Sequence, residues 1–160
     1  MVQKERLQIL NSRPILSGQP YVLYWMQASQ RVQENPALFH AVQQARALHK
    51  PLVVAFGLTP TFLEASERQY VFLLEGLQDV AERLRMRGIR FVLTLEGPEQ
   101  GMIALASKAA MVVTDRSYGR MERQWRATVF SHVACRMVQV ESNVIVPVTA
   151  VSNKEVYSAA

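Results

Sequence analysis

The sequence contains one cysteine and no long apolar run. Cys135 stands alone among 160 residues, which excludes an internal disulfide and a metal site built from cysteines. No stretch approaches the ~18 apolar residues of a transmembrane helix, and the charged start, residues 1–6, lacks the apolar core of a signal peptide. These absences predict a cytoplasmic protein that does not enter a membrane.

The motifs of common enzyme classes are missing as well. No G-x-G-x-x-G follows the first apolar run and no G-x-x-x-x-G-K-[ST] occurs, so a standard dinucleotide or triphosphate site is not expected. His40, His49 and His132 lack metal-ligand spacing. Cys135 has no neighbour arranged to activate it, and no nucleophile elbow occurs. We expect no catalytic residue and no metal in this chain.

The composition is that of one globular domain, with 49% apolar and 19% charged residues. The net charge of +5 raises the question of nucleic-acid binding. However, the cluster of arginines in residues 83–90 surrounds the end of an expected helix, where cations oppose the helix dipole. Arg116, Arg120 and Arg123 recur at helical spacing, which is more typical of a solvated face. Direct DNA binding by this chain is therefore not expected.

Five short apolar runs alternate with helical patterns, as in repeated β-α units. The runs cover residues 21–26, 52–56, 89–94, 111–114 and 137–140. Several are apolar at nearly every position, which indicates parallel strands covered on both faces. Because parallel crossovers are almost always right-handed, we predict an α/β fold. Its form is a doubly wound, five-stranded, mostly parallel Rossmann-like sheet with helices on both faces.

The helices between these runs have recognisable ends. Asn35 suits an N-cap and Pro36 the first position of a helix. Ser66 and Gln69 have the spacing of a capping box for a second, long helix, and Gly88 suits its left-handed stop. Two further helices are expected within residues 97–109 and 121–133.

The chain divides into three expected parts. Residues 1–20 are predicted to form an N-terminal helix and a connector, with Leu7 and Leu10 as the contact face of that helix. Residues 21–143 form the Rossmann-like domain. Residues 144–160 form a less regular segment, which we call the exit segment.

A ligand site is expected beyond the carboxyl ends of the strands, where open α/β sheets bind their ligands. These ends offer aromatic surface, glycine for close approach and hydrogen-bonding side chains, which suits a flat, partly polar ring. The candidate residues are Trp25, Met26, Gln27, Phe56, Gly57, Leu58, Glu96, Thr114, Asp115 and Arg116.

Several of these positions have simpler interpretations. Trp25 is typical of core, Gly57 of a turn, and Asp115 of a cap on the following helix. Gly76, inside the long helix, is expected to allow close packing on the sheet.

Strings spread over the whole chain resemble class II cyclobutane pyrimidine dimer photolyases. They are Arg13-Pro14 with residues 21–27 and Arg31, residues 51–59, residues 67–77, residues 112–118 with Arg120 and Trp125, and residues 143–148 with Lys154, Glu155 and Tyr157. They occur in order and without large gaps. The chain thus resembles the N-terminal α/β domain of that family.

The resemblance implies a light-harvesting, or antenna, domain. In some family members this domain holds a deazaflavin or a folate-type chromophore. The catalytic FAD, the electron-transfer tryptophans and the DNA surface belong to a following C-terminal helical domain, which the resemblance implies as the partner. Trp25 and Trp125 fall in antenna-domain strings and carry no electron-transfer role. FAD binding and lyase activity are accordingly not expected of this chain alone.

Two alternatives remain open. One is a stand-alone Rossmann-like module that binds a small ligand or a nucleotide and has no part in repair. The other is an interaction domain in which two copies of the chain pair through the surface that the helical domain would cover.

Overall fold

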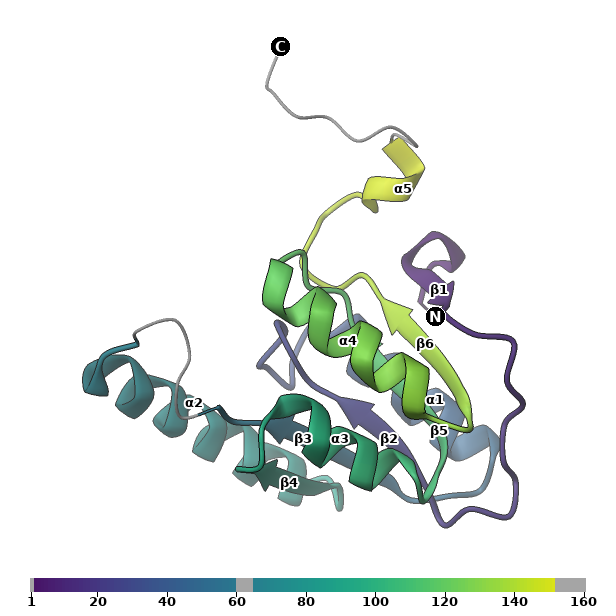
Figure 1. Cartoon of the computed structure of the whole chain (residues 1–160), viewed down its shortest axis with the longest axis horizontal. Helices are drawn as coiled ribbons and strands as arrows, with labels where there is room; N and C mark the ends of the chain where they lie inside the picture. Colours follow the sequence, from purple (N-terminus) through teal and green to yellow (C-terminus); the bar gives the residue numbers. More distant parts are fainter. Residues whose placement is uncertain (1, 60–64, 152–160) are drawn as a thin grey trace.

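Six strands form one mostly parallel sheet in the computed structural model, which describes residues 2–59 and 65–151 (Figure 1). The strands are β1 (Leu7–Ile9), β2 (Tyr21–Trp25), β3 (Leu52–Gly57), β4 (Arg90–Thr94), β5 (Ala109–Asp115) and β6 (Arg136–Val140). They are ordered β1-β6-β5-β2-β3-β4. Every neighbouring pair is parallel except β1 and β6. The chain lays down β2, β3 and β4 outward, then crosses back to β5, so the order reverses between β2 and β5.

Helices cover both faces of the sheet, which confirms the expected α/β class (Figure 1). They are α1 (Pro36–Ala47), α2 (Glu67–Arg85), α3 (Pro98–Ala106), α4 (Arg120–His132) and the short α5 (Val148–Val151). Val22 and Tyr24 of β2 pack with α1 and α2, whereas Leu23 and Trp25 pack with α3 and α4. This alternation follows from the two-residue period of a strand. Buried on both faces, the strand must be apolar throughout.

The helix ends follow the local sequence. The side chain of Asn35 accepts a hydrogen bond from the backbone N–H of Leu38 at 2.9 Å, as an N-cap should. Gln69 accepts one from the backbone N–H of Ser66 at 2.7 Å. Gly88 closes α2 with a φ of 70°. The expectation for Gly76 is wrong, because a Cβ added there would meet nothing within 4 Å.

The N-terminal segment differs from the sequence-based expectation. Within the described part of residues 1–20 there is one 3₁₀ turn, Lys4–Arg6, and then strand β1 rather than an amphipathic helix. Leu7 pairs with Val140 across the antiparallel β1–β6 ladder. The edge of β6 offers unpaired backbone groups, and satisfying them outweighs the weak helical pattern of a short segment. The sheet consequently has six strands, one more than predicted.

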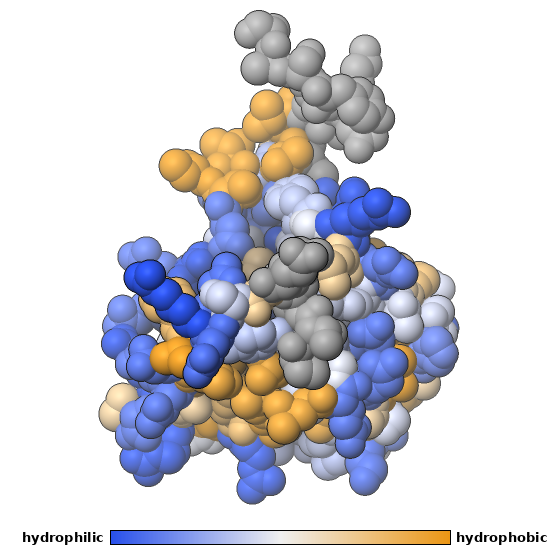
Figure 2. Space-filling model, turned by 60° about the vertical axis from the view of Figure 1, so that its left-hand side comes forward, coloured by the Kyte–Doolittle hydropathy of each residue, from blue (hydrophilic) through white to orange (hydrophobic). Residues whose placement is uncertain are grey.

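The start of the exit segment is tied back to the N-terminal turn. Arg6 donates to the carbonyl oxygens of Val144 at 2.8 Å and Ile145 at 2.7 Å. The described part of the segment carries exposed apolar side chains: Ile145 is 95% exposed and Val146 is 55% exposed. Figure 2 shows this apolar group at its top, below the grey atoms. The resemblance strings at Lys154, Glu155 and Tyr157 lie outside the described residues. No helix in the described ranges has the length and apolar character needed to cross a membrane.

Candidate functional site

The loop that follows β2 is organised around the carboxylate of Asp115 at the end of β5. One oxygen accepts hydrogen bonds from the Tyr24 hydroxyl at 3.1 Å and the Gln27 backbone N–H at 2.8 Å. The other accepts from the backbone N–H groups of Ala28 at 2.6 Å and Ser29 at 2.8 Å. Asp115 is fully buried, and these four donors occupy both of its oxygens. Asp115 therefore fixes the loop between β2 and α1.

Tyr24 and Asn35 extend this network toward α1. The Asn35 amide donates to the Tyr24 oxygen at 3.1 Å and to the carbonyl of Ser29 at 3.0 Å. Burial, together with the neighbouring Asp115 carboxylate, raises the pKa of Tyr24 well above its usual value. The phenol therefore stays protonated and acts as a donor to Asp115.

Arg126 of α4 joins the same loop from the opposite face of the sheet. Its guanidinium donates to Gln27 Oε1 at 2.9 Å and to the carbonyl of Ser117 at 2.6 Å. Its side chain is buried, and this desolvation lowers the pKa of Arg126 while the nearby Asp115 carboxylate opposes the shift. Arg126 and Asp115 together hold Gln27 by its side chain and its backbone.

A cavity of about 250 Å³ opens beside Gln27, at the carboxyl ends of β2 and β3. Among the described residues, helices α2 and α4 and the start of α3 also contribute to its wall. The residues that line it are Trp25, Met26, Gln27, Gln30, Phe56, Gly57, Leu58, Thr59, Ala65, Gln69, Tyr70, Leu73, Pro98, Glu122 and Trp125. Such a wall, mostly apolar and aromatic with a few polar groups, is typical of a small-molecule site. The volume suits the ring of a ligand, with any attached chain left outside.

Six of the ten candidate residues line this cavity: Trp25, Met26, Gln27, Phe56, Gly57 and Leu58. The other four, Glu96, Thr114, Asp115 and Arg116, do not. Thr114 and Asp115 are fully buried and support the loop from behind, while Glu96 is exposed. Arg116 lies over the ring of Tyr118, 5.0 Å from its centroid, and near the buried Glu141 carboxylate at 3.8 Å.

Gly57 has a packing role within the cavity wall. A Cβ added there would lie 2.5 Å from the Cα of Pro98, so only glycine lets the start of α3 approach β3 this closely. The turn interpretation of Gly57 is thereby replaced by a close-packing one.

The helical part of the wall was not anticipated from the sequence. Tyr70 and Leu73 of α2 and Trp125 of α4 lie in expected helices, but none of them was among the candidate site residues. Periodicity shows that a helix has a buried face, but it does not show which end of that face borders a cavity. The sequence held one usable signal: the expected helices carry the aromatic residues Tyr70 and Trp125, which can line a cavity together with the aromatic residues Trp25 and Phe56 at the strand ends.

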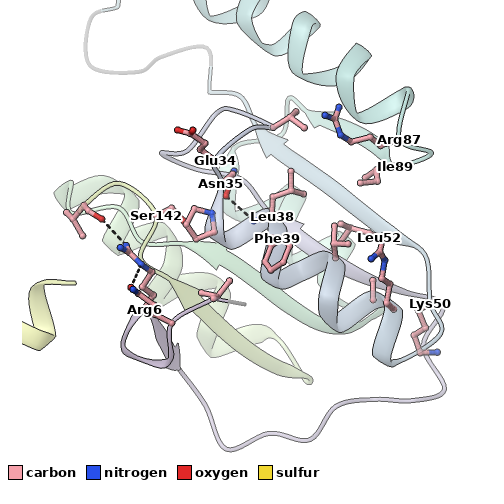
Figure 3. Close-up of a pocket in the computed structure, with 18 residues that line it drawn as sticks. Arg6, Glu34, Asn35, Leu38, Phe39, Lys50, Leu52, Arg87, Ile89 and Ser142 are labelled. Atoms are coloured by element: carbon pink, nitrogen blue, oxygen red, sulfur yellow. Dashed lines mark hydrogen bonds between the residues drawn. The ribbon is translucent and has the colours of Figure 1, made fainter. Parts of the chain in front are cut away.

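A second, wider hollow runs along α1 and is drawn in Figure 3. Its volume is about 1100 Å³, and Leu38 and Phe39 lie near its middle, with Arg6 at one end and Lys50 at the other. It is an open groove beside α1, and Arg46, Lys50 and Arg87 line it in addition to Arg6. Among the described residues, no unpartnered buried polar atom belongs to this groove. The cavity at the strand ends is therefore the stronger candidate.

Few of the described residues around the cavity carry an acid, a base or a metal ligand. Among its described lining residues, only Glu122 and Tyr70 carry titratable side chains. The part of the chain that the structure describes holds no group of three or more His, Cys, Asp and Glu side chains suited to a metal. Burial raises the pKa of Cys135, which lies inside the core away from the cavity.

The comparisons with known proteins agree on one family. The sequence matches the family model of DNA photolyase over residues 22–160. It is 46% identical over 160 residues to the deoxyribodipyrimidine photo-lyase of Methanothermobacter thermautotrophicus, covering 99% of this chain and 36% of that protein. It is 35% identical to the deoxyribodipyrimidine photo-lyase of Potorous tridactylus, covering 98% of this chain and 30% of that protein. The chain thus spans about a third of the length of these relatives.

Solved structures show the same fold at low sequence identity. A bacterial class III photolyase from Agrobacterium tumefaciens superposes with a TM-score of 0.60 at 20% identity, covering 76% of this chain and 26% of that one. A universal stress protein in complex with cAMP superposes with a TM-score of 0.54 at 16% identity, covering 79% of this chain and 100% of that one. These likenesses bear on the fold alone. The family match and the whole-chain identity decide the relationship: the chain belongs to the DNA photolyase family and corresponds to its N-terminal α/β domain.

Proposed function

We propose that this chain is the light-harvesting domain of a class II DNA photolyase, and that its chromophore ring sits in the cavity at the carboxyl ends of β2 and β3. The observation that carries the proposal is a preformed aromatic cavity, bordered by both tryptophans, in a domain of the photolyase family. An antenna must hold an absorbing ring rigidly and away from water. It needs no acid, base or nucleophile.

The chromophore class that fits is a deazaflavin or a folate-type pterin. Both present a flat ring with polar edges, which matches aromatic walls interrupted by the amides of Gln27, Gln30 and Gln69. In this proposal FAD, the light-driven cleavage of pyrimidine dimers and the contact with DNA belong to a C-terminal helical domain. The exit segment leads toward that partner.

The test is a binding titration of the purified chain with a deazaflavin and with folic acid, followed by equilibrium dialysis. Saturable binding of one of them at 1:1 stoichiometry is expected, with quenching of tryptophan fluorescence because Trp25 and Trp125 both border the cavity. No saturable binding of either would contradict the proposal.

A matched pair of variants locates the ligand. Leu73 of α2 lines the cavity, whereas the adjacent Leu74 points away from it and is exposed. Leu73→Trp should fill the cavity and weaken binding at least about tenfold, since overpacking forces neighbouring groups apart. Leu74→Trp should bind like the parent. Equal effects of both would place the ligand elsewhere.

The second candidate is a nucleotide-binding module, favoured by the fold shared with universal stress proteins solved with cAMP and with dAMP. Phosphate groups need cations or clustered N–H groups. No lysine or arginine occurs among the described residues that line the cavity. Saturable binding of ATP, with none of the deazaflavin or folic acid, would favour this module over the antenna.

A further inference from the structure

One polar atom beside the cavity lacks the partner that burial demands. Gln27 is 8% exposed, and its Nε2 finds no hydrogen-bond partner among residues 2–59 and 65–151. A buried donor left without an acceptor destabilises the folded chain. Native proteins contain few buried polar groups without a partner, and such a group often marks the position of a bound water, ion or ligand.

The direction of the Gln27 amide is fixed by its neighbours. Arg126 Nη1 lies 2.9 Å from one end of the amide, and a guanidinium can only donate, so that end is the oxygen. The Thr114 hydroxyl lies 3.4 Å from the same oxygen. The NH₂ end must then point away from Arg126.

The surroundings of Gln27 make its NH₂ group a strong and rigid donor. Its backbone N–H is bound to Asp115 at 2.8 Å, so the residue cannot turn without breaking that bond. A positive guanidinium on the carbonyl oxygen draws electrons from the amide and strengthens its N–H groups as donors. The remaining buried orphan in the described chain, Thr94 Oγ1, is different because it is packed under Gly101.

From this geometry we infer that Gln27 is the specificity-determining residue of the cavity: its Nε2 donates a hydrogen bond to a ring carbonyl oxygen of the bound chromophore, and Arg126 is the positioning residue that holds the amide. The inference rests on the proposed function and sharpens it. The ligand class becomes a planar heteroaromatic ring with an exocyclic carbonyl at the edge that enters first. A ring with an amino group at that edge is rejected, because two donors would face each other.

Gln27→Glu tests the inference with little change of shape. The carboxylate keeps an acceptor for Arg126 and adds an ion pair, and urea denaturation checks that Q27E still folds. However, an oxygen that can only accept now stands where the parent has its NH₂ group. Gln124→Glu is the control, because Gln124 is exposed on α4 outside the cavity and undergoes the same change of charge.

Affinity is measured by equilibrium dialysis with three probes: a deazaflavin, folic acid and aminopterin. Folic acid and aminopterin differ at ring position 4, where one carries an oxo group and the other an amino group. The parent and Q124E should bind the deazaflavin, folic acid or both, since each carries a ring carbonyl. If the folates bind, both proteins should bind folic acid more tightly than aminopterin. Q27E should bind the carbonyl-bearing probe about tenfold or more weakly, and should reverse the order of the two folates.

The outcomes separate the two claims. If Q27E binds the carbonyl-bearing probe as tightly as the parent does, Gln27 is not the donor and the inference fails while the antenna proposal stands. If the parent binds none of the probes, the antenna proposal fails and takes the inference with it. Gln27→Met, which lacks both donor and charge, is a second check: it should lose the preference between the folates without reversing it.

Discussion

Replacing Asp115 by asparagine should destabilise the domain more than any other single carboxylate-to-amide change on this sheet edge. The carboxylate accepts two hydrogen bonds on each oxygen, three of them from backbone N–H groups of residues 27–29. An asparagine has one acceptor oxygen, so its NH₂ group must face either two backbone N–H donors or one backbone N–H and the Tyr24 hydroxyl, which can rotate to accept.

The magnitude follows from the stranded N–H donors. Each buried donor without an acceptor costs about 1–3 kcal/mol, and at least one is stranded in either orientation. Loss of the negative charge near the buried Arg126 adds to the cost. We expect a loss of about 4 kcal/mol, a large part of the ~5–15 kcal/mol that stabilises a typical domain.

The assay is urea denaturation followed by circular dichroism. With a slope of about 2 kcal/mol per molar urea, the midpoint of D115N should fall by about 2 M. The control is D79N, because Asp79 pairs with Arg83 on the exposed face of α2 at 2.7 Å with its side chain 59% exposed. Such a pair contributes about 0.5 kcal/mol or less. A D115N midpoint close to that of D79N would refute the assignment of Asp115 as the anchor of the loop.

Four further substitutions have defined outcomes. Gly57→Ala should destabilise the domain by about 1–3 kcal/mol, because its Cβ would meet the backbone of Pro98 at 2.5 Å. Gly76→Ala lies in open space on a helix and should stabilise the domain by about 0.5–1 kcal/mol in the same urea assay. Changes in the free energy of unfolding with the same sign for both variants would contradict this. Burial lowers the pKa of His40, so the unfolded chain binds more protons as the pH falls through about 6.5 and the free energy of unfolding should drop there. His40→Gln should reduce that drop in urea titrations from pH 8 to pH 5, and an unchanged pH slope would rule the explanation out. Arg6→Gln should free the exit segment from its two carbonyl contacts and give several-fold faster limited proteolysis there; cleavage at the parental rate would show that other contacts hold the segment.

The parallel core was predictable because its signals are local. Runs such as residues 52–56 are apolar throughout, and Asn35 and Ser66 mark helix starts by side-chain chemistry alone. The first strand was not predictable in this way. Leu7 pairs with Val140, more than 130 residues away in the sequence. Nothing within the N-terminal segment indicates that the edge of β6 is available for pairing.

The candidate site was predictable in its position and only partly in its membership. The rule of strand ends brought Trp25 and Phe56 to the same cavity, because neighbouring parallel strands end at the same edge. The same rule also selected Asp115, whose side chain turns to the loop behind the cavity. Trp125 was missed as a wall residue because helical periodicity shows which side chains face the sheet. It does not show which of them lie level with the carboxyl ends of the strands.

The decisive difference between Asp115 and Gln27 lies in their partners rather than in their residue types. Both are buried polar side chains at the ends of adjacent strands, and sequence assigns them the same candidate role. Asp115 has every oxygen occupied by the protein, so a ligand could bind it only by displacing a donor from the fold. Gln27 has its oxygen occupied, and its NH₂ group has no hydrogen-bond partner among the described residues. A buried polar group that the fold satisfies stabilises the fold, and one that the fold leaves half satisfied is where a ligand gains most. By this criterion the ligand chemistry of the domain centres on Gln27, and Asp115 serves it by holding the loop still.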